Sequence, residues 1–281
     1  MKELIIAGDS WSFGSEIRDP SLKEEVVDWD DRNDSYRIKN IWPTHLSNYL
    51  NVDLKNLSFP AISNDRIVRT LINYITKFYL IDKKSTNDIF VIVGLSSPER
   101  KEFFHKDKKG NWVTIWPAWE HNYSEYSGME NFVKSYISYF NNKEEYLNRY
   151  LNQIYYLQNF FNSNNIRYLI FQSFYQPTEF HNKINEWKEI PYINLWNNSF
   201  HGSGDTKDTK YFMGSSEPVI WKLIDDKRFM NKTKENHSFH GFLLNKQIEN
   251  NEKYFVGLHP NEMGHKLWAS NILSYINKNN L

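Results

Sequence analysis

Two apolar segments that each end at a glycine constrain the fold of this chain most. They are residues 3–8 (ELIIAG) and 88–94 (DIFVIVG). Short apolar runs without polar alternation are typical of strands that are buried on both faces. Weaker strand patterns occur at 52–57, 166–173 and 191–195, and apolar residues recur at helical spacing in 64–80, 143–162 and 261–277. This alternation predicts an α/β fold, with a parallel sheet covered by helices on both faces.

The rest of the chain indicates one domain with two additions. The 281 residues contain no repeat and no linker rich in Gly, Ser or Pro, so we expect a single domain over 1–281. Two stretches, about 100–142 and 197–255, do not continue the alternation and are longer than ordinary connections. We predict that both are loop-rich insertions.

Charge and composition exclude several classes of function. Lys+Arg and Asp+Glu are 34 each, so the chain lacks the basic surplus that is typical of nucleic-acid binders, and we expect no nucleic-acid partner. The absence of Cys excludes thiolate nucleophiles and thiolate zinc sites. No signal-peptide pattern and no long apolar run is present, so we expect a cytoplasmic protein without a membrane partner. The oligomeric state stays open.

A serine follows the first predicted strand directly, in Gly8-Asp9-Ser10. In a parallel sheet, sites form at the carboxyl ends of the strands. A serine in a tight turn at that edge presents both its hydroxyl and its own N–H group, as a nucleophile requires. The alternative is an ordinary turn in which Asp9 and Ser10 only cap a helix.

A histidine precedes the last predicted helix, in His259-Pro260-Asn261-Glu262-Met263-Gly264-His265. A histidine held by the stiff backbone before a proline is a candidate general base. The alternative is a helix-start turn whose histidine only packs.

Together, the two motifs resemble the SGNH/GDSL hydrolases, which are serine esterases and lipases. The resemblance implies a flavodoxin-like three-layer α/β/α fold. It also implies that Ser10 is the nucleophile and His259 the base, with Asp9 of the same block counted among the catalytic residues. No cofactor is implied.

Two middle segments resemble the remaining blocks of that family in part. Residues 56–65 (NLSFPAISND) match the block in which a Gly donates its N–H to the oxyanion, and Ala61 occupies the Gly position. Residues 94–97 match the Gly-x-Asn block, with Ser96 in place of the Asn. The resemblance therefore implies oxyanion donors at Ser10 and Ala61, together with Ser96 or Asn64.

The catalytic acid departs from the family pattern, because Val256 stands three residues before His259. One interpretation is a Ser–His dyad whose imidazole is oriented by a backbone carbonyl. Another is a carboxylate from elsewhere, and the candidates are Glu99, Asp205, Asp225 and Asp226. A third is a chain that no longer catalyses.

The function we expect is hydrolysis of an ester, most simply a small acyl group, with a glycan ester as one substrate class. Acyl transfer by the same residues, and a catalytically impaired module that binds a glycan or a protein, are the alternatives. Aromatic residues are 17% of the chain, and we expect a substrate surface formed by Trp11, Trp112, Trp116 and Trp119. The alternative for the insertion tryptophans is a small satellite core. His237, His240 and Glu235 offer metal-ligand types without a supporting helical pattern, so no metal is expected.

Overall fold

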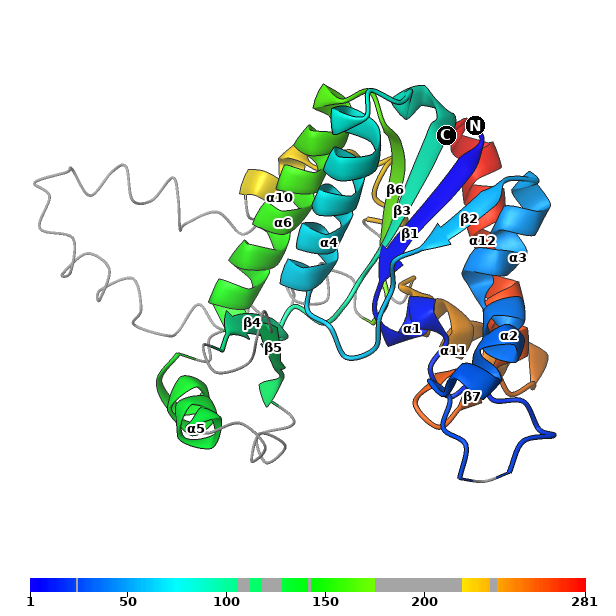
Figure 1. Ribbon diagram of the computed structural model, residues 1–281, viewed down its shortest axis with the longest axis horizontal. Coiled ribbons are helices and arrows are strands. Elements are labelled where there is room, and N and C mark those ends of the chain that lie inside the picture. The colour runs from blue at the N-terminus through cyan, green and yellow to red at the C-terminus, as the bar shows by residue number, and fades with distance from the viewer. Residues whose placement is uncertain (24, 106–111, 118–127, 141–142, 175–218, 233–236) are drawn as a thin grey trace, which may run out of the picture.

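The computed structural model describes residues 1–23, 25–105, 112–117, 128–140, 143–174, 219–232 and 237–281. Four parallel strands form its central sheet in the order β2-β1-β3-β6 (Figure 1). The strands are β1 (Glu3–Gly8), β2 (Asp53–Asn56), β3 (Ile89–Leu95) and β6 (Arg167–Gln172). This order agrees with the flavodoxin-like arrangement.

Alternate residues of the strands face two separate cores, because successive side chains of a strand point to opposite faces. On β1, Ile5 and Ala7 belong to one core, whereas Leu4 and Ile6 belong to the other. All four side chains are buried. The continuous apolar run of β1 follows from burial on both faces.

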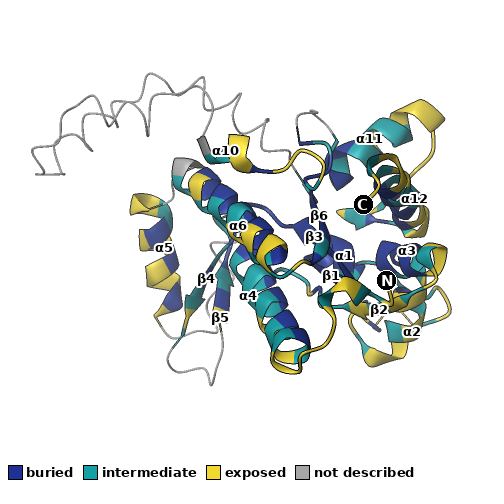
Figure 2. Ribbon diagram, turned by 90° about the horizontal axis from the view of Figure 1, so that it is seen from above, coloured by how far each residue is buried: buried dark blue, intermediate teal, exposed yellow. Residues whose placement is uncertain are grey.

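Helices α4 (Asn64–Ile75) and α6 (Lys143–Ser163) cover the first face of the sheet (Figure 1). A short π-helical segment (Thr76–Ile81) extends α4, and α10 (Val219–Leu223) packs beside α6. Their inward sides are buried and their outer sides are exposed (Figure 2). This layer matches the helices predicted over 64–80 and 143–162.

Three helices supply the core of the opposite face: α3 (Trp42–Leu50), α11 (Phe239–Asn250) and α12 (Glu262–Asn279). Helix α2 (Asp31–Asn40) packs against α3 and α12. On this face the Phe239 and Trp268 rings stack at a centroid distance of 4.5 Å. The molecule therefore has the predicted three layers, α/β/α.

Most of the sequence-based boundaries are confirmed. The strands expected at 3–8, 52–57, 88–94 and 166–173 are all present, as is the last helix. Helices α2 and α3 were not predicted, since α2 is mostly polar and α3 carries a proline in its first turn. The strand expected at 191–195 lies outside the described residues.

The two expected insertions differ from each other. The first contains the antiparallel hairpin β4 (Lys101–Phe104) and β5 (Trp112–Ile115), followed by α5 (Met129–Tyr139). These elements share a small core of their own. In the second, α11 packs directly on the main core, so the prediction of a loop-rich stretch is wrong for residues 239–250. Among the helices that the structure describes, none is long and apolar enough to cross a membrane.

His265 links α12 to α3 and generates a prediction about stability. Its Nδ1 accepts the backbone N–H of Trp42 at 3.2 Å, and its side chain is fully buried. Burial lowers the pKa of His265 to about 3, whereas the unfolded imidazole titrates near its ordinary pKa of about 6.5. Below about pH 6.5 the unfolded chain binds a proton that the folded chain does not bind.

We therefore expect His265 to reduce the free energy of unfolding as the pH falls from about 6.5 toward 3, by at most ~1.4 kcal/mol per pH unit. Urea unfolding at several pH values measures this slope. In His265→Asn, whose Oδ1 can still accept the Trp42 N–H, the slope should be smaller than in the wild type. Equal slopes would contradict the buried neutral imidazole.

Candidate active site

Ser10 lies in a tight turn at the carboxyl end of β1, where the short helix α1 (Ser10–Phe13) begins. Asp9 caps this helix, and its carboxylate accepts the N–H of Trp11 at 3.1 Å. Gly14 ends the helix at φ +89°, and its N–H donates to the Ser10 carbonyl at 2.9 Å. The turn is thus fixed at both ends by backbone hydrogen bonds.

Close packing holds the turn against the sheet. Gly8 and Gly94 pair in register at the ends of β1 and β3, and the buried Ser12 side chain lies against both. A Cβ on Gly8 would lie 2.4 Å from Ser12 Oγ, and one on Gly94 would lie 2.8 Å from it. Any larger residue at either glycine would displace the turn that carries Ser10.

Asp9 is completely buried beneath the turn, beside a buried arginine. Arg100 Nη1 lies 3.9 Å from Asp9 Oδ2, and the Ser173 hydroxyl donates to Asp9 Oδ1 at 3.5 Å. Burial raises the pKa of Asp9, and the Arg100 charge opposes this effect only in part. Asp9 therefore stabilises the turn from its buried side, and the Arg100 guanidinium balances the charge of its carboxylate.

Arg100 also joins the hairpin insertion to the sheet edge. Its guanidinium lies 4.6 Å from the centroid of the Trp116 ring and 5.7 Å from that of Phe174. The same guanidinium donates to Ser96 Oγ at 2.9 Å. Arg100 thus connects the ends of β3 and β6 with the first insertion.

The side chains of Ser96 and Asn64 do not form the oxyanion donors that we expected. Asn64 donates to the Ser96 carbonyl at 3.0 Å and accepts the Ser96 N–H at 2.7 Å, and both residues are buried. The Ser96 hydroxyl lies against Arg100. These groups hold the end of β3 in place, because their polar atoms are occupied within the protein.

The backbone donors expected at Ser10 and Ala61 stay available. Within the part of the chain that the structure describes, neither N–H group donates to a protein acceptor. Ala61 has φ +58°, the left-handed conformation that favours glycine. Ala61 thus adopts at this position the backbone conformation that a Gly adopts readily.

His259 lies at the same sheet edge, in the hairpin formed by β7 (Phe255–Val256) and β8 (His259–Pro260). Strand β8 contacts α1, and the imidazole centroid is 6.3 Å from that of Trp11, the residue after Ser10. Asn261 then caps α12 by accepting the Gly264 N–H at 2.9 Å. The fold therefore brings the first and last sequence motifs together.

Glu16 supplies a carboxylate at His259, which sequence reasoning missed. Its Oε2 lies 3.1 Å from His259 Nδ1 and accepts the backbone N–H groups of Leu258 and His259 at 2.9 and 3.2 Å. The ring N–H is not aligned closely enough with this oxygen to form a hydrogen bond. The only signal in the sequence is an acidic residue six positions after Ser10, which no family pattern marks.

Among the described residues, the acids predicted for this role lie elsewhere. Asp225 is exposed and accepts the backbone N–H groups of Lys227 and Arg228. Glu99 lies near α6, where burial, the Tyr136 phenol and the Glu99 carboxylate raise the pKa of Tyr146. Asp205 lies outside the described residues. The acid at His259 therefore comes from the N-terminal part of the chain.

The prediction of a tryptophan surface is wrong for Trp11. Trp11 is 1% exposed and packs edge-on against Phe239, so it forms part of the core beneath the site. The Arg69 guanidinium covers the Trp112 ring at 4.2 Å, as Arg100 covers that of Trp116. Trp119 lies outside the described residues. These arginine contacts favour the structural alternative for Trp112 and Trp116.

His237 and His240 are not part of a group of possible metal ligands among the described residues. Among the described residues, no group of three His, Asp, Glu or Cys side chains is arranged to hold a metal ion. The His240 ring lies 5.7 Å from that of Trp11, and burial lowers the pKa of His240. Glu235 lies outside the described residues.

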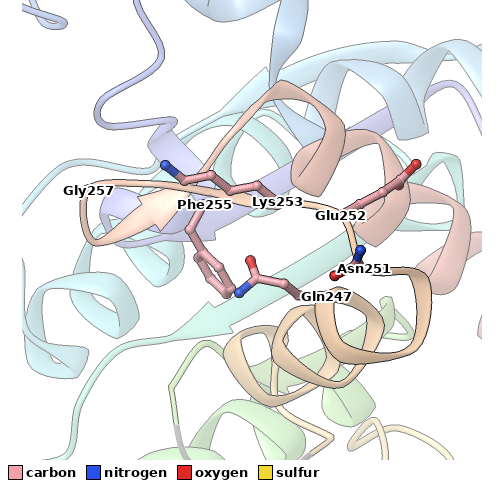
Figure 3. A pocket seen from close by; sticks show the side chains of 6 residues that line it. All are labelled: Gln247, Asn251, Glu252, Lys253, Phe255 and Gly257. Atoms are coloured by element: carbon pink, nitrogen blue, oxygen red, sulfur yellow. The ribbon is translucent and has the colours of Figure 1, made fainter.

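An open depression adjoins the His259 hairpin (Figure 3). Its volume is about 640 Å³. It is lined by Gln247, Asn251, Glu252, Lys253, Phe255 and Gly257. Amide, carboxylate and ammonium groups thus line the depression together with one aromatic ring, and its lining residue Gly257 is two positions before His259.

Comparisons with known proteins give a family and a set of distant structures. The model of a family of unknown function (DUF6071) matches residues 24–188, a range that contains none of Ser10, Glu16 and His259. None of the curated proteins matches the sequence.

Three of the similar solved structures are described as esterases. The psychrotrophic esterase EstA from a Pseudoalteromonas species has 11% identity and a TM-score of 0.43, with 99% of this chain and 98% of that chain covered. A carbohydrate esterase whose active site displays divergent catalytic and non-catalytic binding functions has 10% identity and a TM-score of 0.40, with 99% and 65% covered. The carbohydrate esterase family 2 enzyme from Corynascus thermopiles has 9% identity and a TM-score of 0.41, with 98% and 67% covered. At these scores, the activities of the neighbours carry no argument for this chain.

The buried Asp9–Arg100 pair generates a prediction about stability. Arg100→Met keeps an apolar stem but leaves a buried carboxylate without its partner, which should lower the free energy of unfolding by about 3 kcal/mol at neutral pH. Because protonated Asp9 needs no counter-charge, the loss should shrink as the pH falls. Urea unfolding of the variant and the wild type measures both effects.

Arg32→Met is the matched control, since Arg32 forms a largely exposed pair with Asp30 and its loss should change stability little. A loss in Arg100→Met no larger than in this control would contradict the role of the buried pair.

Proposed function

The chain belongs to the DUF6071 family of unknown function, and we propose that it is a serine hydrolase that cleaves an ester through an acyl-enzyme. One observation carries the proposal: at the carboxyl edge of the sheet, a serine in a fixed turn lies beside a hairpin whose histidine contacts a carboxylate. Nucleophile, base and acid are the three groups that this chemistry needs.

In the proposed reaction, Ser10 Oγ attacks the ester carbonyl carbon while His259 Nε2 accepts the hydroxyl proton. The C–O bond to the leaving alcohol then breaks, and the imidazolium returns its proton to that oxygen. Water, deprotonated by His259, attacks the acyl-enzyme and releases the acid and free Ser10. No cofactor takes part in these steps.

The N–H groups of Ser10 and Ala61 are the proposed donors to the negative oxygen of the tetrahedral intermediate. Both are without a protein acceptor in the described part of the chain, and the Ser10 backbone is held by the N–H groups of Gly14 and Ser15, which donate to its carbonyl. Fixed donors need no reorganisation when charge develops, which is the main source of oxyanion stabilisation.

The polar depression beside His259 supports an alcohol with several hydroxyl groups, such as a sugar, as the leaving group. His259 protonates the leaving oxygen, so this part of the substrate lies on the hairpin side of the site. The amides, the carboxylate and the ammonium group in its lining match a polyol surface (Figure 3). We therefore propose a small acyl ester of a sugar-like alcohol as the substrate.

Acyl transfer and a binding module without catalysis are the two alternatives to hydrolysis. Acyl transfer to a second alcohol would use the same residues. A binding module was motivated by Val256 and Ser96, and the Glu16 carboxylate now offsets the missing acid at 256. This contact favours hydrolysis over binding alone.

Replacement of the proposed nucleophile or base tests the function directly. We expect Ser10→Ala and His259→Ala each to lower kcat for p-nitrophenyl acetate by about 10³-fold or more, because the two residues act as a unit. A fluorophosphonate probe should label wild-type protein at Ser10 and fail to label Ser10→Ala.

Ser270→Ala, on the outer surface of α12, is the control and should behave as wild type. Unchanged turnover in both folded variants, or a wild-type Ser10 that stays inert to the probe, would refute the proposal.

The depression generates a separate prediction about the substrate. Lys253→Ala should raise KM for an acetylated monosaccharide by about 2–10-fold, the effect of one lost hydrogen bond, while KM for p-nitrophenyl acetate stays unchanged. Lys278→Ala, an exposed lysine at the end of α12, serves as the control. Equal changes for both substrates would contradict a sugar-binding role.

A further inference from the structure

We infer that Glu16 is the positioning residue of the catalytic histidine, in place of the acid that would stand three residues before it. This inference rests on the proposed function of Ser10 and His259. It assigns the third member of the site to a segment that follows the nucleophile, 243 residues before His259 in sequence.

The contacts of one carboxylate oxygen carry the inference. Glu16 Oε2 lies 3.1 Å from His259 Nδ1 and also accepts two backbone N–H groups, those of Leu258 and His259. The same atom thus fixes the backbone of the hairpin and faces the ring nitrogen opposite the reacting Nε2. In unliganded sites such bonds are often poorly aligned and tighten when substrate binds.

The backbone of Glu16 is strained in the conformation that places this side chain at His259. Its φ is +68°, a conformation that disfavours residues with a Cβ. The Glu16 N–H donates to the Asp28 carboxylate at 2.6 Å, and Asn33 Nδ2 donates to the carbonyls of Ile17 and Asp28. A non-glycine residue held in this region by several contacts is typical of functional sites.

Gly257 provides the space that the carboxylate occupies. A Cβ at Gly257 would lie 2.5 Å from Glu16 Oε2 and 2.8 Å from its Cδ, and Gly257 has φ +55°. The end of a flexible side chain can move away, so an alanine here would displace the carboxylate, and it would also strain the backbone at this φ. The absence of a side chain at Gly257 therefore leaves the space that the Glu16 carboxylate needs.

Other charged groups around the pair stay constant in the variants proposed here. Asp9 interacts electrostatically with His259 from below α1, and His265 does so from α12. Asp28 binds the Glu16 backbone, Glu262 at the start of α12 is bonded to Tyr36, and His240 of α11 lies against Trp11 and Phe255. A changed rate in Glu16→Gln would therefore report the loss of the Glu16 charge.

Glu16→Gln separates the electrostatic role from a purely structural one. Its amide oxygen can still accept the N–H groups of Leu258 and His259, but it carries no charge toward the imidazolium. We expect kcat/KM to fall by about 10²–10⁴-fold. The loss should fall on kcat more than on KM, because the Glu16 charge acts on the imidazolium that forms during the reaction, and Glu16→Asp should recover part of the rate.

Glu99→Gln is the matched control, since it neutralises the same side chain at a rival candidate position and should keep wild-type kinetics. Gly257→Ala should reproduce the loss seen in Glu16→Gln. The double variant should be no worse than either single variant, because both remove the same contact.

An NMR spectrum of the His259 imidazole gives a readout that does not depend on turnover. The resonance of its Nδ1–H should move upfield in Glu16→Gln relative to the wild type, because a neutral amide is a weaker acceptor than a carboxylate, and should stay unchanged in Glu99→Gln.

The outcomes separate the two proposals. If the fluorophosphonate probe labels wild-type Ser10 while Glu16→Gln keeps wild-type kinetics and the wild-type imidazole resonance, the positioning role is wrong and the esterase stands. If wild-type Ser10 is inert, the esterase fails and the positioning role fails with it, whatever the imidazole resonance. A loss of rate in Glu99→Gln in place of Glu16→Gln would assign the role to the rival acid.

Discussion

The parallel register of β1 and β3, which sets Gly8 opposite Gly94, determines where the parts of the site lie. Both strands end at the same edge, and the space that their missing side chains leave is filled by Ser12. The turn after β1 is therefore packed against the end of β3, and this packing determines where Ser10 lies. Asp9 and Arg100 stabilise the same turn from inside the protein.

Hydrophobic patterning predicted this framework well, because burial on both faces leaves a direct trace in the sequence. The apolar runs at β1 and β3, and the helical spacing in α4, α6 and α12, gave the sheet and its layers. Helix α2 left no such trace, since it is mostly polar and only a few of its residues are buried. The turn motifs at Ser10 and His259 predicted which sheet edge to consider, because parallel strands place their carboxyl ends together.

The acid could not be found in the same way. Motif spacing indicates a catalytic acid only where the acid is close in sequence to the histidine, and Val256 occupies that position here. Glu16 reaches His259 through tertiary structure, by a strained backbone and a glycine on the opposite segment. The roles of Asn64 and Ser96 were misjudged for a related reason. Their residue types suit oxyanion donors, but the fold turns their polar atoms toward each other.

A crystal structure of the protein after reaction with a phosphonate shows directly whether Ser10, His259 and Glu16 form one reactive site. We expect phosphorus bonded to Ser10 Oγ, a phosphoryl oxygen within hydrogen-bond distance of the Ser10 and Ala61 N–H groups, and His259 Nδ1 hydrogen-bonded to Glu16. An adduct on another residue, or an adduct on Ser10 with His259 Nδ1 turned away from Glu16, would contradict this expectation.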